Sequence, residues 1–80
     1  MKIPAIKNLV EVASMDELIA AEEAIIEEQP PKIEVIGDDE GEQLTHVMAA
    51  IFIKNHMDDY KADFKTALRE YTKKVRESIS

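Results

Sequence analysis

Residues 44–57, which read LTHVMAAIFIKNHM, are the stretch that decides the fold. The middle of this stretch, residues 47–53, holds seven side chains in a row without a polar group. Seven residues are too few to span a bilayer, which takes about 20 apolar residues. The run is also apolar on all sides, whereas a helix at a protein surface keeps one polar face. The sequence therefore predicts a central helix that its neighbours cover on most sides.

The length and composition of the chain favour one small globular domain. Eighty residues with 45% hydrophobic and 34% charged side chains lie within the range of folded proteins. We expect residues 1–80 to form a single helical domain with a core so small that association would add to its stability. The absence of cysteine excludes a disulfide framework and a thiol nucleophile. No apolar segment of signal-peptide length opens the chain, so we expect a cytoplasmic protein outside the membrane.

The charges are unevenly distributed along the chain. Residues 1–60 carry four basic and fourteen acidic side chains, a net charge of −10, and residues 61–80 carry six basic and three acidic ones, a net charge of +3. A basic helix can neutralise phosphates, but the acidic remainder would repel a nucleic acid over the same short range. We therefore expect no nucleic-acid binding, and we expect the basic segment to face acidic groups of its own chain.

Two short helices are predicted in the first third of the chain. Pro4 suits the first turn of a helix, and apolar residues then recur at helical spacing, which predicts a helix over residues 4–12. The β-branched run 9–13 leaves a strand as the alternative there. A capping box that begins at Ser14 opens a second helix over residues 15–28, and two prolines end it.

Two longer helices are predicted in the second half. Asp39 is expected to cap a helix over residues 42–58, and Asp63 a helix that runs to about Ser78. Because only residues 58–62 separate them, we expect an antiparallel hairpin, with the first two helices covering the far side of the third. The fourth helix has the clearest amphipathic pattern, and its apolar stripe consists of Phe64, Leu68, Tyr71, Val75 and Ile79.

Residues 32–36, KIEVI, have the composition of a short strand bounded by turn residues. A strand needs partners for its backbone N–H and C=O groups, and the chain has no second convincing strand. Three solutions stay open: pairing with an N-terminal strand, pairing with the same segment of a second copy, or an extended connector. The predicted fold is therefore mainly α, with four helices and a strand or extended segment at 32–36. The alternative is an α+β fold with a small sheet formed with the N-terminus or across a dimer.

An acidic cluster beside a histidine is the candidate for a metal site. Asp38, Asp39 and Glu42 lie around the start of the third helix, and His46 follows Glu42 by one turn on the same helix face. A carboxylate oxygen and an imidazole nitrogen could there reach one divalent ion. Acidic side chains at a helix start are also explained by capping and by the helix dipole, without any ion. We therefore predict no metal, and these four residues are the candidates for the alternative of a divalent-metal-binding domain.

The residues typical of catalysis are not grouped in any pattern that indicates an enzyme. The hydroxyl-bearing residues lack a glycine-rich elbow or a triad context, and two glycines are too few for a phosphate loop or a dinucleotide fingerprint. We expect no catalytic residue and no cofactor. The sequence favours a non-enzymatic protein-interaction module, whose partner is another protein or a second copy in a homodimer.

Two long stretches resemble a known family. IEVIGDDEGEQLTHVMAAIFIKNHM, residues 33–57, and DFKTALREYTKKVRESI, residues 63–79, are similar to a small bacterial domain family that has no assigned function. The likeness extends over nearly the whole chain, and residues 37–46 and 64–76 are its most specific parts. The resemblance implies no catalytic residues. Genes of such a family tend to lie beside thioredoxin-like and peroxiredoxin-like genes, which implies an accessory role in a thiol redox system as a further alternative.

Overall fold

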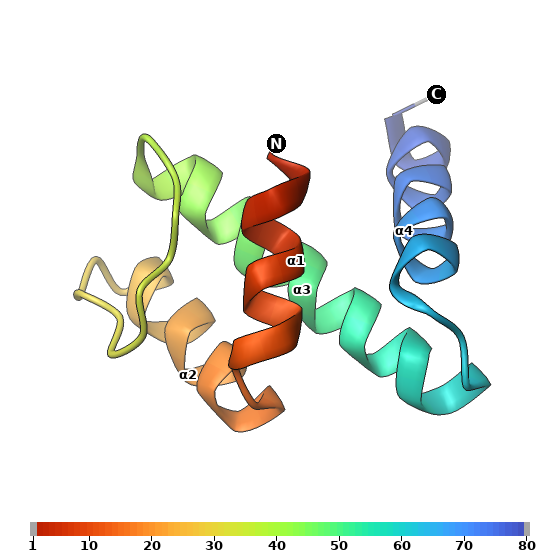
Figure 1. The fold of residues 1–80 in the computed structure, drawn as a ribbon. Helices are drawn as coiled ribbons and strands as arrows, with labels where there is room; N and C mark the ends of the chain where they lie inside the picture. Colours follow the sequence, from red (N-terminus) through yellow and green to blue (C-terminus); the bar gives the residue numbers. More distant parts are fainter. Residues whose placement is uncertain (1, 80) are drawn as a thin grey trace.

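The computed structural model describes residues 2–79, without the side chain of residue 79, and these residues form four α-helices (Figure 1). No strand occurs among the described residues, so the mainly α prediction is confirmed. The alternative sheet with the N-terminus is wrong, because that segment is the first helix. The helices are α1 (Ile3–Val12), α2 (Met15–Ile26), α3 (Glu40–Tyr60) and α4 (Phe64–Ile79).

The longest helix, α3, is the centre of the fold and packs against each of the other three (Figure 1). Val47, Ala50 and Ile53 are fully buried on it, whereas the side chain of Met48 is 48% exposed. As predicted, the other helices cover α3 on most sides. The side that carries Met48 stays exposed, because three helices do not enclose a fourth. Of the helices that the structure describes, none combines the length and apolar character needed to cross a membrane.

Hydrogen bonds within the chain define both ends of α2. The hydroxyl of Ser14 accepts from the Glu17 N–H at 3.2 Å, and the Ser14 N–H donates to the Glu17 carboxylate at 2.9 Å, which confirms the predicted capping box. At the other end, Glu28 has a left-handed φ of 61°, and the next N–H, of Gln29, donates to the Ala24 carbonyl at 2.8 Å. This bond closes the helix two residues earlier than predicted, before the prolines are reached.

The connection between α3 and α4 is shorter than predicted. The expected connector at residues 58–62 is wrong, since α3 continues to Tyr60 and ends at Lys61, whose φ of 54° is left-handed. Asp63 then caps α4 as predicted, because its carboxylate accepts from the Thr66 N–H at 2.9 Å. Hydrogen bonding from the Thr66 side chain, followed by that from its backbone N–H, lowers the pKa of Asp63 below its ordinary value of 3.8. At the other end of α3, the carboxylate of Asp39 accepts from the Glu42 N–H at 2.7 Å.

Within the single chain, residues 32–36 form an extended connector, so the predicted pairing with an N-terminal strand does not occur. Ile33 and Val35 are half-buried and pack against the core, while Lys32, Glu34 and Ile36 are exposed. The strand-like alternation therefore serves to bury two apolar side chains, and within residues 2–79 the segment pairs with no strand.

Gly37 lies close against Gln43 of α3, and replacing it by alanine is expected to lower the stability of the fold. A Cβ at Gly37 would lie 2.7 Å from Cγ and 2.9 Å from the backbone N of Gln43. Because part of that clash is with backbone, we expect the free energy of unfolding to fall by about 1–3 kcal/mol in a denaturant titration. Gly41→Ala is the matched control: its Cβ meets nothing closer than 3.4 Å, and the change should stabilise α3 slightly. Equal effects of the two changes would contradict this account.

Candidate functional site

His46 is completely buried and joins α3 to two distant parts of the chain. Its Nδ1 lies 2.6 Å from the carbonyl oxygen of Ile36, so Nδ1 carries a proton and donates it. Its Nε2 accepts from the backbone N–H of Lys2 at 2.9 Å. Both ring nitrogens are thus used, and the two contacts together fix one neutral tautomer. The imidazole holds the start of α1 and the end of the connector against α3.

The acidic residues near His46 are engaged with their own backbone and with Lys2. The Asp38 N–H donates to the Glu42 carboxylate at 3.1 Å, so Glu42 acts as a cap for the segment before α3. The Nζ of Lys2 lies 3.4 Å from the Asp38 carboxylate and 3.6 Å from that of Glu42. The hydrogen bond and the charge of Asp38, followed by the charge of Glu42, raise the pKa of Lys2 above 10.5. Lys2 was not a predicted site residue.

The four candidate metal ligands are not brought together as a donor set. Asp39 is occupied as the cap of α3, and the ring of His46 turns inward to backbone partners. Within residues 2–79, no group of three or more histidine and acidic side chains is placed to hold an ion. The geometry gives these residues structural roles and offers no support for the metal-binding alternative.

An aromatic cluster joins α3 to α4. The ring centroids of Phe52 and Tyr71 are 5.5 Å apart, and the ring of His56 stacks on that of Phe52 at 6.0 Å. Tyr60 extends the cluster, with its ring 4.5 Å from His56, although its own side chain is 71% exposed. Burial raises the pKa of Tyr71 above 10.0. The cluster continues from the core to the surface, where Phe52, His56 and Tyr60 line an open hollow of about 290 Å³ between α3 and α4.

Lys54 is a second structural cation that sequence reasoning missed. Its Nζ donates to the carbonyl oxygen of Ala13 at 2.6 Å and lies 3.4 Å from that of Val10. These carbonyls belong to the C-terminal end of α1, where the helix dipole favours a positive charge. The ammonium therefore links α3 to α1 at the end opposite to the His46 contacts.

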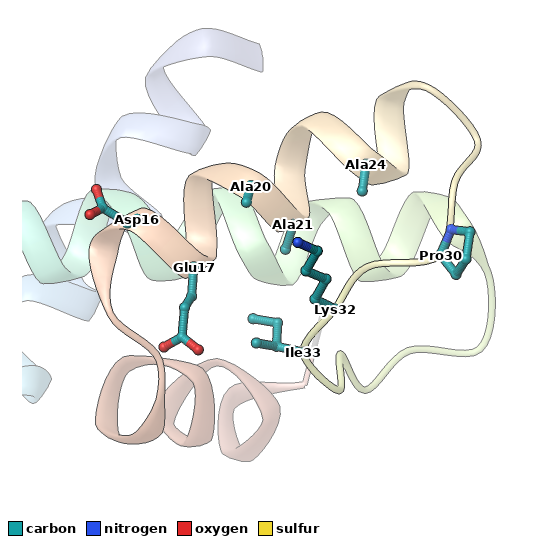
Figure 2. Close-up of a pocket in the computed structure, with 8 residues that line it drawn as sticks. All are labelled: Asp16, Glu17, Ala20, Ala21, Ala24, Pro30, Lys32 and Ile33. Carbon is teal, nitrogen blue, oxygen red and sulfur yellow. The ribbon is translucent and has the colours of Figure 1, made fainter.

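A shallow hollow lies between α2 and the connector that follows it (Figure 2). It encloses about 340 Å³, and its walls are mainly apolar. Asp16 and Glu17 stand at one end of it, and no nucleophile with a neighbouring base lines it. Such a hollow can accept apolar side chains but has no groups for bond chemistry. Its other lining residues are Ala20, Ala21, Ala24, Pro30, Lys32 and Ile33.

Among the described residues, the basic side chains of α4 form no ion pair with the acidic helix α2, although Lys74 lines a hollow together with Asp59 of α3. Figure 1 shows α2 and α4 on opposite sides of α1, so the basic helix does not face the acidic one. The ion pairs between described residues start from Lys2, and no basic side chain of α4 forms an ion pair with α1, α2 or α3 within residues 2–79. The positive charge of α4 therefore stays available at the surface.

Comparisons with known proteins place the chain in a family without adding a function. The family model described as "Family of unknown function (DUF6952)" matches residues 1–80, so the chain belongs to this family. Neither the curated proteins nor the solved structures include a significant match to the chain. The resemblance to a family without an assigned function is thus confirmed.

Proposed function

We propose that this member of a family of unknown function is a non-enzymatic interaction module that binds protein and associates with its own copies. The observation that carries the proposal is the incomplete covering of α4. Ala67 is its one fully buried side chain among the described residues, and its basic groups have no ion-pair partner on the other helices. An amphipathic helix with an open apolar flank and unpaired charge is typical of a binding surface.

The apolar side chains at the surface support binding over catalysis. Large apolar residues are exposed on every helix and could contribute to contacts with a partner. The three groups whose pKa is shifted are each explained by a contact that stabilises the fold. The exposed apolar residues are Ile3, Val12, Ile19, Ile26, Ile36, Met48, Tyr60 and Val75.

Sedimentation equilibrium of the full chain tests the proposal. We expect the weight-average mass to rise above that of one 9.1 kDa chain as the concentration is increased. Val75→Asn should weaken this association because it makes the apolar flank of α4 polar, whereas Val12→Asn, on the exposed side of α1, should leave it unchanged. A strictly monomeric chain up to about 1 mM would contradict the proposal, since even weak specific contacts populate a complex at that concentration.

A further inference from the structure

The C-terminal end of α4 is a basic projection. Every residue from Lys73 to Ser78 is exposed, whereas a helix packed on a core hides one stripe of each turn. The projection carries Lys73, Lys74 and Arg76 around Val75, which is 36% exposed. Figure 1 shows this end of α4 as the end farthest from its connection to α3. A partner of this end should offer acidic groups and a small apolar hollow.

The hollow beside α2 has those properties. Its apolar wall is made by alanines of α2 and by Ile33 of the connector, with Asp16 and Glu17 at its edge (Figure 2). Six acidic side chains and no basic one occur between residues 14 and 31. Lys32 also lines the hollow, with its ammonium beside Ala21, and Pro30 stands at the end away from Asp16 (Figure 2). Asp16 and Glu23 are exposed and take part in no ion pair within residues 2–79.

The two surfaces cannot satisfy each other within one chain. They lie on opposite sides of α1, and the close helix contacts of α2 and α4 are both with α3 (Figure 1). A second copy presents the missing surface to each of them. The net charge of −7 makes two copies repel at long range, so an attraction between them has to be local.

We propose that the projecting end of α4 of one copy docks on α2 of a second copy, with Val75 in the alanine-lined hollow and the basic side chains against Asp16 and Glu23. This inference rests on the proposed self-association and names its surfaces. Because the two surfaces differ, the contact is head to tail, and a dimer is its first step.

Charge reversal on each surface tests the contact. One variant carries Lys73→Glu with Arg76→Glu on α4, and the other carries Asp16→Lys with Glu23→Lys on α2. Each should weaken self-association about tenfold or more, because like charges then meet at the contact. An equimolar mixture of the two variants should associate more tightly than either alone, since the reversed α4 can attract the reversed α2.

A matched control separates the local contact from overall repulsion. The reversal on α4 makes the chain four charges more negative, and so does Lys7→Glu with Lys61→Glu, two exposed positions away from both surfaces. This control should lose much less affinity than the α4 variant. Thermal unfolding followed by circular dichroism must show that all variants are folded before their masses are compared.

The outcomes distinguish the inference from the proposed function. Recovery of association in the mixture supports the contact between α2 and α4. If the wild-type chain associates but the reversals do not weaken it, or the mixture fails to recover, the inference is wrong while self-association stands. If α4 instead docks on a different protein, the wild-type chain stays monomeric up to about 1 mM, and both the inference and the proposed self-association are wrong.

Discussion

We expect the replacement of His46 by alanine to lower the free energy of unfolding by about 3 kcal/mol. The change removes a fully buried ring and leaves the N–H of Lys2 and the carbonyl of Ile36 without their partner. A buried backbone group without a hydrogen bond costs more than the net value of the bond itself. Urea denaturation followed by far-ultraviolet circular dichroism measures the loss.

Thr45→Ala is the control for this change, because Thr45 is the exposed neighbour of His46 on α3 and should alter stability by less than about 0.5 kcal/mol. The tautomer gives an independent readout. Nitrogen NMR of the imidazole should show a protonated Nδ1 and an unprotonated Nε2 in the folded chain. The opposite tautomer, or a loss no larger than that of the control, would mean that the ring does not make these contacts.

Ile53→Ala should lower the free energy of unfolding by a similar amount, about 3 kcal/mol. Ile53 is fully buried at the centre of α3, so truncating its side chain opens a cavity that the surrounding helices cannot fill. Met48→Ala on the same helix removes a side chain that is 48% exposed and should cost less than about 1 kcal/mol. The denaturant midpoints of the two variants provide the comparison. Similar losses of unfolding free energy at both positions would contradict the burial of Ile53 and the exposure of Met48.

The helices could be predicted because their signals are local. The capping residues Ser14, Asp39 and Asp63 act on amides three positions ahead, so a short sequence pattern contains the whole interaction. The end of α3 could not be predicted in the same way. No glycine or proline follows Tyr60, and Lys61 adopts a left-handed conformation that its side chain does not favour.

Residues 32–36 show where β propensity misleads. Their β-branched side chains suit a strand, but a strand also needs a neighbouring backbone, which this chain does not provide among its described residues. Burial of Ile33 and Val35 against the helices supplies the stabilisation that a sheet would otherwise give. Tertiary context thus overrides the local preference.

The candidate site could be predicted only in part. The helical spacing of Glu42 and His46 was sufficient to place them one turn apart, but not to show that the ring turns inward. Its partner Lys2 is 44 residues away, and a contact over that distance leaves no local pattern in the sequence. The uneven distribution of charge along the chain could be read directly from the sequence. Whether the basic helix lies against the acidic one depends on how the helices pack. The packing keeps α2 and α4 apart (Figure 1).

The left-handed conformation of Lys61 has a consequence for how the molecule opens. A non-glycine residue in this conformation costs about 1–2 kcal/mol, so the joint before α4 is kept in place by the contacts of α4 and not by its own preference. Breaking those contacts would let Lys61 relax, and we expect α4 to detach as a unit from α1, α2 and α3. We therefore expect α4 to open before the global unfolding of the chain, which hydrogen exchange of its amides would show as weaker protection than in α3.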